Sequence, residues 1–423
     1  MKIFDKIIKT GLALGVAGFL FTSCNKLDLD PTATKTDSST APTIRALLND
    51  PGFSILKAAV EKASTFSTTP SLLQLLDAPG VRYTFFAPDD AAFAASGIPS
   101  AAALAFFTPG ALDTALRYHI VPQALYAASI SSQFPNFQYP TIFNPAPSIS
   151  PLLRLTTFPS KRGAAAWVNN VPVKGVDIQA SNGVVHKVAA VVMPPSIDLW
   201  TKIQTDPQLT YLKAAITRAD KDVPVGSRLQ DALSIAANPL ALASNLTVFA
   251  PVDAAMNAFL KGAVTKALVG LGVDPATAQV QAGQLVDGYG PLLLSDPASI
   301  PVYGPQLAAA VTPTLAKGIV AYHILSSQSG TFAPPGIRVF SVNIPTTATN
   351  VKTLLNSGGA PYTAHPGLTI QATFASGLPV VQSATVKGAA NPTASNVIIG
   401  LTSSDQHCIN GVLHKIDQAL LPQ

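Results

Sequence analysis

The six histidines of this chain are its side chains best suited to acid–base catalysis or metal binding. Four of them stand in segments that occur twice: His119, His186, His323 and His414. Each pair could form a metal or acid–base site, or each ring could lie in the core and bond neighbouring backbone groups. We favour the core, because an unpaired buried polar group costs about 1–3 kcal/mol and because both copies retain the rings.

A second cluster of metal-binding side chains lies near the C-terminus, at Asp405, His407, Cys408 and His414. Its spacing is not that of a zinc knuckle, so we predict neither a metal nor a cofactor. The sequence also contains no Gly-x-Ser-x-Gly elbow, no His-Glu-x-x-His helix and no Gly-x-x-x-x-Gly-Lys phosphate loop. These patterns predict a protein that is not an enzyme.

The charge pattern does not favour binding to nucleic acid. The formal net charge is +5, and it falls to (27 − 3) − (22 − 1) = +3 when residues 1–23, with three lysines and Asp5, are removed. Lys and Arg are scattered rather than clustered with aromatic residues. If Cys24 is lipidated, Cys408 is the one remaining cysteine and no intramolecular disulfide can form.

The chain is a tandem duplication, because four segments recur in the same order. The matches are 50–60 with 206–216, 83–93 with 246–256, 117–121 with 321–325, and 182–188 with 410–416. The offset between the copies grows along the chain, which indicates two large globular units with different insertions rather than a solenoid of fixed period. The second copy carries the longer insertions.

These motifs resemble those of the fasciclin domain, an adhesion-type module. The resemblance rests on Thr-Phe-Phe-Ala-Pro-Asp at 84–89, the central Tyr-His and the terminal Asn-Gly-Val-Val-His, and it covers both copies. It implies an α+β fold of two fasciclin-like domains, at residues 43–195 and 199–423, each a wedge-like β-sandwich with packed helices. Met256 stands where the first signature has phenylalanine, and Phe259 is close enough to fill that space.

Residue patterns predict helices early and strands late in each unit. In the first unit we expect helices at 43–48, 53–63, 91–95 and 112–119, with Asp89 as an N-cap. We expect strands at 83–86, 152–157, 166–168, 176–180 and 183–192. The short linker at 194–198 contains two prolines and should restrict the relative orientation of the domains.

The N-terminus has the pattern of a bacterial lipoprotein. Residues 1–23 combine three lysines with a short apolar run, which is too short for a spanning helix and is typical of a signal peptide. Cys24 resembles the lipidated cysteine of a lipobox; the alternative is plain secretion with a free Cys24. Residues 24–42 predict a flexible tether. We expect a lipid-anchored outer-membrane protein that is surface-exposed, although a periplasmic location stays open.

Two functions fit these observations. The first is a cell-surface adhesion or protein-interaction protein whose partner is a protein or glycan; Tyr118, His119, Tyr322 and His323 are the candidate interaction residues. The alternative is an accessory lipoprotein that captures glycans or peptides for an outer-membrane uptake system. For that role, insertions at 261–315 and 330–368 would form recognition loops. Their candidate stacking residues are Tyr289, Tyr303, Phe332, Phe340 and Tyr362.

Overall fold

The structure is a computed structural model that describes residues 40–422 except 149, 327–336, 358–361 and 376–379. Pro42–Gln423 form one compact unit. Cys24 and the predicted signal peptide lie outside the described residues, as does nearly all of the predicted tether. Below, residues 43–195 are called the first repeat and residues 199–423 the second repeat.

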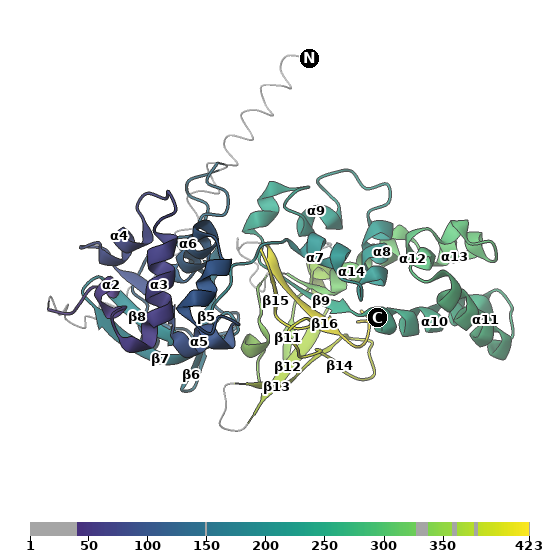
Figure 1. Cartoon of the computed structure of the whole chain (residues 1–423). Helices are drawn as coiled ribbons and strands as arrows, with labels where there is room; N and C mark the ends of the chain where they lie inside the picture. Colours follow the sequence, from purple (N-terminus) through teal and green to yellow (C-terminus); the bar gives the residue numbers. More distant parts are fainter. Residues whose placement is uncertain (1–39, 149, 327–336, 358–361, 376–379, 423) are drawn as a thin grey trace, which may run out of the picture. The chain divides into compact units, whose positions relative to one another are not determined.

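Helices form the first half of the first repeat (Figure 1). They are α2 (Ile44–Leu47), α3 (Ser54–Ala63), α4 (Leu72–Asp77), α5 (Asp90–Ala95) and α6 (Pro109–Tyr118), with 3₁₀ turns η1 (Pro51–Phe53), η2 (Ala101–Phe106) and η3 (Ala127–Ser129). The side chains of Ser71, Asp89 and Thr108 each accept a hydrogen bond from the backbone N–H three residues later. These caps satisfy N–H groups that the helices leave unpaired, and they fix where the helices begin.

The strands of the first repeat make a mixed sheet in the order β2-β1-β8-β7-β6-β5. Their bounds are β1 (Tyr83–Pro88), β2 (Ile120–Val121), β5 (Pro159–Arg162), β6 (Ala165–Val168), β7 (Val171–Ala180) and β8 (Gly183–Val188). Strands β1 and β8 run parallel, and the other pairs are antiparallel. A separate two-stranded sheet pairs β3 (Tyr139–Pro140) with β4 (Thr156–Thr157).

The second repeat begins with a larger set of helices. Their bounds are α7 (Leu199–Thr205), α8 (Thr210–Ala219), α9 (Leu229–Leu233), η4 (Pro239–Ala243), α10 (Asp253–Gly270), α11 (Pro275–Tyr289), α12 (Leu292–Ser295), η5 (Pro297–Ser299), α13 (Gly304–Ala310) and α14 (Pro313–Tyr322). Helix α10 is the counterpart of α5, but it has 18 residues where α5 has 6. The helices from α10 to α13 therefore occupy the segment 261–315, which the sequence predicted as long recognition loops.

The strands of the second repeat form two four-stranded sheets, in the orders β10-β9-β16-β15 and β11-β12-β13-β14. Their bounds are β9 (Leu246–Pro251), β10 (Ile324–Leu325), β11 (Thr349–Val351), β12 (Leu368–Phe374), β13 (Val381–Lys387), β14 (Ser395–Asn396), β15 (Gln406–Cys408) and β16 (Gly411–Ile416), with 3₁₀ turns η6 (Ser341–Asn343), η7 (Leu354–Ser357) and η8 (Tyr362–Ala364). Side chains of both sheets, such as Ile416 and Ile370, meet in one core. The second repeat is thus a β-sandwich with helices packed on it.

The structure confirms the predicted α+β class and most of the predicted elements. Asp89 caps α5 as expected. Three strand predictions were wrong in extent: 152–157 shortens to Thr156–Thr157, 176–180 is the second half of Val171–Ala180, and 183–192 ends at Val188. Strand β5 was not predicted, because Pro-Ser-Lys-Arg has no apolar alternation. Met256 is 2% exposed, and Phe259 packs against the same core, as its position suggested.

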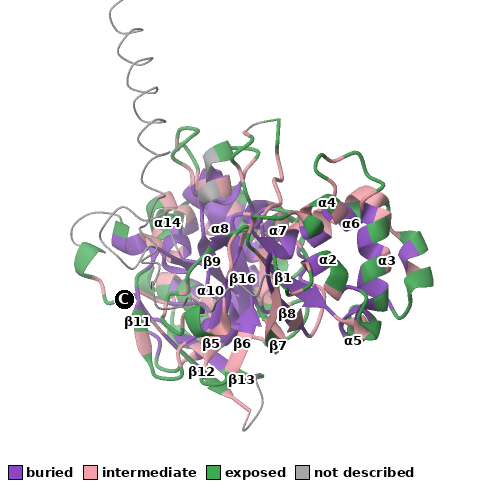
Figure 2. Cartoon of the chain, turned by 90° about the vertical axis from the view of Figure 1, so that its left-hand side faces the viewer, coloured by how far each residue is buried: buried purple, intermediate pink, exposed green. Residues whose placement is uncertain are grey.

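The buried cores show that the repeats are joined by more than the linker. One cluster serves the helices of the second repeat and another serves the helices of the first, and Figure 2 shows the central strands β8, β9 and β16 in the buried colour. A third cluster lies between the two sheets of the second repeat and includes Phe158 and Trp167 of the first. The ring centroids of Phe158 and Phe340 lie 5.9 Å apart. Restricted orientation, predicted from the linker, therefore has a basis in a shared core.

Candidate functional site

The repeated Asn-Gly dipeptide begins the parallel strand of each repeat. Oδ1 of Asn182 accepts a hydrogen bond from Ile44 N at 2.8 Å, and its Nδ2 donates to Leu76 O at 2.9 Å. Asn410 makes the equivalent bonds, to Leu199 N and Leu233 O. The glycine that follows leaves room for the neighbouring strand, because a Cβ at Gly183 would stand 2.1 Å from Tyr83 O. In each repeat, the dipeptide therefore connects the helices to the sheet.

The two Tyr-His pairs are equally structural. His119 and His323 are each 1% exposed. Nδ1 of His119 donates to Ala115 O at 2.8 Å, and its Nε2 accepts from Val192 N at 2.9 Å. His323 repeats both bonds, to Ile319 O and from Leu420 N. Burial lowers the pKa of both rings to about 4, so both are neutral at physiological pH.

Their tyrosine neighbours are buried too, which corrects the predicted interaction role. Tyr118 is 1% exposed and Tyr322 0%. Tyr118 Oη donates to Thr156 O at 2.8 Å, and Tyr322 Oη donates to Gly367 O at 2.6 Å. Burial raises the pKa of Tyr118 to about 12. These four residues are fully engaged inside the repeats, so in this structure they present no side chain to a partner.

The second histidine pair bonds backbone in the same way. His186 Nε2 donates to Leu125 O at 2.7 Å, and its Nδ1 accepts from Asp177 N at 3.2 Å. His414 makes the matching bonds, to Val339 O and from Asp405 N. Both rings are 0% exposed. The core placement of all four motif histidines is confirmed, because each ring nitrogen already has a backbone partner.

The C-terminal cluster is arranged around a buried arginine rather than a metal. Arg338, 4% exposed, donates from Nη1 to His407 Nε2 at 2.8 Å and from Nη2 to Ile409 O at 2.9 Å. Its guanidinium carbon stands 5.0 Å from the ring centroid of Phe158, in the first repeat. Burial lowers the pKa of Arg338 to about 10; burial and the charge of Arg338 keep the pKa of His407 well below its usual value. His407 is thus a neutral acceptor at the junction of the repeats.

The cysteine and the aspartate of that cluster are also buried or hydrogen-bonded within the repeat. Cys408 is 1% exposed, and burial raises the pKa of its thiol to about 12, so it is neither ionised nor reactive at neutral pH. Asp405 accepts from Ser341 N and Oγ, both at 2.6 Å. Among the described residues, no group of three or more His, Cys, Asp or Glu side chains could hold a metal ion.

Of the five aromatic residues predicted to form a stacking platform, three have described side chains, and none of these three is fully exposed. Phe340 is 0% exposed and lies in the core between the sheets of the second repeat, which overturns its predicted role. Tyr289 and Tyr303 are half-buried against the helical core. Phe332 lies outside the described residues, as does the side chain of Tyr362. Apolar rings in inserted segments gain more from filling a core than from facing water, which explains the outcome.

A polar cleft of about 250 Å³, here called the junction cleft, lies where the two repeats meet. Its lining comprises Ser131, Ser132, Gln133, Phe134, Ser160, Lys161, Arg162, Gly163, Trp167, Val342, Asn343, Pro345, Thr346 and Thr347. Hydrogen bonds that cross between the repeats hold it together. Asn343 Nδ2 donates to Ser160 Oγ at 2.7 Å, and Arg162 Nη2 donates to Ile344 O at 2.9 Å.

Two cations line the junction cleft, and no carboxylate is among the described residues of its lining. The ammonium of Lys161 donates to Ala127 O and Ala128 O, which fixes its position without neutralising it. The guanidinium of Arg162 lies 4.1 Å from the ring centroid of Phe374, and its Nη1 has no hydrogen-bond partner in the part of the chain that the structure describes. Two positive charges without a carboxylate in the described lining favour an anionic partner in the cleft.

Sequence reasoning did not identify these cleft residues. A turn at Gly163, where φ is +57°, is recognisable from the sequence, and Lys161 and Arg162 lie directly before it. The opposite wall comes from residues 342–347, about 180 positions later, and no pattern in the sequence pairs the two segments.

Comparisons with known proteins identify a family model, a sequence and a structure to which this chain is similar. The family model described as Fasciclin domain matches residues 51–194, the first repeat. Protein sll1483 of Synechocystis sp. is 29% identical over 190 residues, which cover 44% of this chain and 92% of that protein. A FAS1 domain pair from the insect cell adhesion molecule Fasciclin I has a TM-score of 0.31 and 16% identity, over 89% of this chain and 95% of that one.

Among the described residues, no helix is both long and apolar enough to cross a membrane.

Proposed function

We propose that this chain is a non-enzymatic adhesion and protein-interaction protein, held on the outer membrane by a lipid on Cys24 and displayed at the cell surface. The junction cleft carries the proposal, because two cations line it without a carboxylate among the described residues. Its partner is an acidic segment of another protein. The match of residues 51–194 to the fasciclin domain supports the same class of function, since that domain is commonly involved in adhesion or protein interaction.

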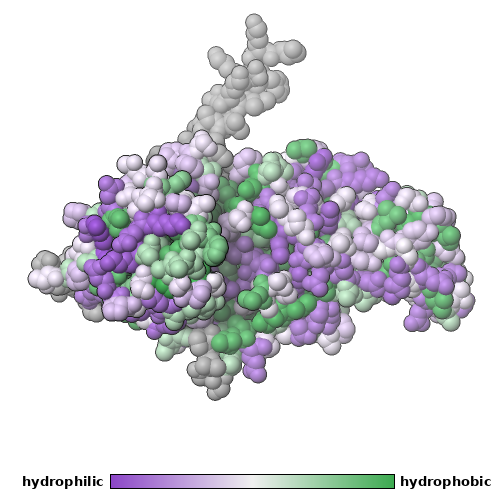
Figure 3. Space-filling model, viewed as in Figure 1, coloured by the Kyte–Doolittle hydropathy of each residue, from purple (hydrophilic) through white to green (hydrophobic). Residues whose placement is uncertain are grey.

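The surface around the cleft suits such a role. On the face shown in Figure 3, hydrophilic and hydrophobic residues are interspersed over both repeats. Ser132, Gln133, Thr346 and Thr347 are exposed at the cleft and offer hydroxyl and amide groups beside the cations. A polar, cationic cleft between repeats that share hydrogen bonds provides specificity through charge and hydrogen bonds.

The cleft is tested with the purified mature chain and a fluorescent oligoglutamate peptide, followed by anisotropy. We expect Lys161→Gln with Arg162→Gln to weaken binding at least about tenfold, and added salt to weaken it further. Lys221→Gln is the matched control, because Lys221 is exposed and is not part of the cleft lining. Equal binding by an oligolysine peptide, or an equal loss in the control, would contradict the proposal.

The anchor is tested separately by protease treatment of intact cells. Loss of the full-length protein from protease-treated intact cells, with release of the Cys24→Ala form from the membrane, supports a lipid-anchored surface protein. Protection until the outer membrane is opened would place the protein in the periplasm and remove cell adhesion from the proposal.

A further inference from the structure

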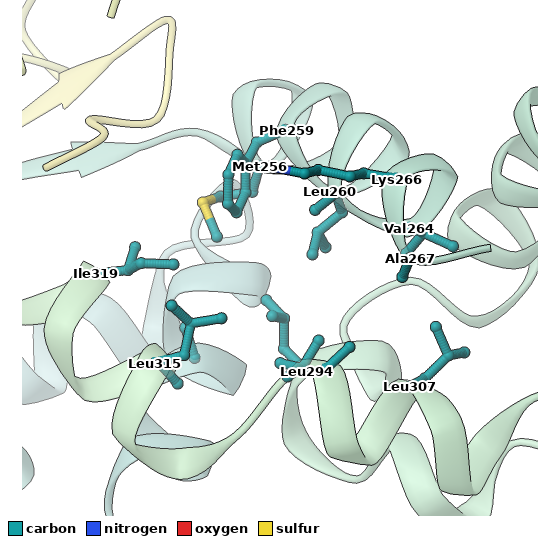
Figure 4. A pocket seen from close by; sticks show the side chains of 15 residues that line it. Met256, Phe259, Leu260, Val264, Lys266, Ala267, Leu294, Leu307, Leu315 and Ile319 are labelled. Carbon is teal, nitrogen blue, oxygen red and sulfur yellow. The ribbon is translucent and has the colours of Figure 1, made fainter. Parts of the chain in front are cut away.

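A second cavity lies within the helices of the second repeat and differs in kind from the junction cleft. It has a volume of about 280 Å³ and lies between α8, α10, α12, α13 and α14. Figure 4 shows side chains from facing helices, among them Leu260, Leu294, Leu307 and Leu315, around a common space. All but one of the residues that line it are apolar, and the exception is Lys266.

The cavity is a product of the insertion in the second repeat. In the first repeat, α5 ends at Ala95 after 6 residues, whereas α10 continues to Gly270 and supplies about half of the cavity wall. Several lining positions carry alanine, including Ala263, Ala267 and Ala316, so no large side chain fills the space. Exposed lining residues such as Ala263, Ala310 and Leu315 show that this cavity is open to solvent, so an apolar ligand can enter it and cover its apolar walls.

The size and lining limit the ligand. An engineered apolar cavity of about 150 Å³ takes up benzene, and this one is nearly twice as large. Sugars and peptides would leave their polar groups unpaired against these walls. A flexible hydrocarbon chain fits, because leucine and alanine walls provide contact without directional demands.

Lys266 supplies the charge that an alkyl carboxylate would need. Its side chain is exposed and has no hydrogen-bond or ion-pair partner among the described residues. It lines both this cavity and a neighbouring hollow formed with Lys261, Gly262, Thr265 and Gln279. The carboxylate of Asp287 is bound by Lys261 and Asn257. Lys266 is therefore a cation available between an apolar space and a polar one.

We infer that the cavity binds an unbranched aliphatic carboxylate, a free fatty acid of medium length. The hydrocarbon tail lies between α10, α12, α13 and α14, and the carboxylate pairs with the ammonium of Lys266 in the neighbouring hollow. This site is separate from the junction cleft, so its ligand is independent of the proposed adhesion partner.

The test is isothermal titration of the mature chain with octanoate, nonanoate and decanoate. We expect one ligand per chain, an affinity that rises roughly fourfold with each added methylene, and no further rise once the cavity is full. Lys266→Glu should weaken decanoate at least about tenfold and leave decanol within about twofold. Ala263→Trp should abolish binding of both, because the indole would enter the cavity from an exposed position of α10.

The controls separate ligand binding from folding and from membrane association. Lys221→Glu carries the same charge change outside the cavity, and the thermal unfolding midpoint of each variant shows whether it folds. If Ala263→Trp does not fold, the comparison of decanoate with decanol in Lys266→Glu still tests the inference, because Lys266 is exposed and its replacement should not disturb folding. Absence of saturable binding by free carboxylates, equal loss of decanol and decanoate in Lys266→Glu, or alkyl binding only from phosphatidylglycerol vesicles would each overturn the inference.

Discussion

In the first repeat, Asp50 and Lys187 stand 3.8 Å apart, with 52% and 28% of their side chains exposed. Their counterparts in the second repeat, Asp206 and Lys415, stand 2.8 Å apart and are 4% exposed each. The same two residue types at equivalent motif positions thus form a partly solvated pair in one repeat and a buried pair in the other.

Two neighbouring substitutions account for the difference. Lys187 lies 4.7 Å from the ring centroid of Phe53, a cation–π contact that holds it partly away from Asp50. The counterpart of Phe53 is Leu209, which has no aromatic face, and the counterpart of Gly52 is Gln208, whose Oε1 accepts from Lys415 at 2.9 Å. The duplicated motif therefore determines the positions of the aspartate and the lysine, and the adjacent residues determine how strongly the two side chains interact.

The largest expected effect tests whether the repeats are energetically separate. Phe158→Ala removes a ring of the first repeat from the core between the sheets of the second repeat, and we expect it to cost about 4 kcal/mol of unfolding free energy. Hydrogen exchange should show faster opening of β12 and β13 in this variant. Phe106→Ala is the control, because Phe106 is 91% exposed. An effect confined to the first repeat would show that the shared core does not couple the two.

The buried ion pair should give the next largest effect. Asp206→Asn keeps an acceptor for Gln208 N, which is 3.1 Å from Oδ1 in the structure, but leaves Lys415 buried without its counterion. We expect a loss of about 3 kcal/mol in denaturant unfolding. Adding Lys415→Met should recover most of this loss, since an apolar side chain needs no counterion. If the loss of stability persisted in the double variant, Asp206→Asn with Lys415→Met, its cause would be the amide of the introduced asparagine and not the unpaired lysine.

The pH dependence of this pair follows from the pKa of Asp206. Burial alone would raise it, but hydrogen bonds from Lys415, Gln208 N and Lys202 outweigh burial and lower the pKa. A lowered folded-state pKa means that the stabilisation is complete above the unfolded value of 3.8 and is lost as pH falls through the lower folded value. The difference between the native chain and Asp206→Asn should therefore shrink below about pH 3.8.

The motif histidines should behave alike in both repeats. His119 and His323 have folded-state pKa values of about 4, below the ordinary 6.5, because burial disfavours the charged ring. The unfolded chain binds these protons first, so the stabilisation from each neutral ring is complete above about pH 6.5 and falls as pH drops toward 4, by about 3 kcal/mol per ring. Between pH 4 and 6.5, the unfolding free energy should change less steeply with pH in His119→Gln, and also in His323→Gln, than in the native chain. If only one of the two variants had a less steep pH dependence, the two histidines would not be equivalent.

The sequence predicted the α+β class, the duplication and the core placement of the motif histidines, because local patterns and recurrence carry that information. Asp89, for example, is recognisable as a helix cap from its neighbours alone. The junction cleft and the apolar cavity of the second repeat could not be predicted. Both depend on packing between segments far apart in the chain, such as Arg162 beside Ile344, and periodicity within one segment says nothing about such a pair.

The smallest effect completes the comparison of the two ion pairs. Asp50→Asn keeps the acceptor for Gly52 N, at 2.9 Å, just as Asp206→Asn keeps its own, so the two variants differ in the burial of the charge that is removed and in the second lysine, Lys202, that pairs with Asp206. We expect a loss below about 1 kcal/mol, because water screens the partly exposed Lys187, which retains its contact with Phe53. Raising the salt concentration should reduce even this loss, whereas it should leave the loss in Asp206→Asn nearly unchanged. Equal losses in the two variants would mean that the motif, and not its surroundings, determines the strength of the pair.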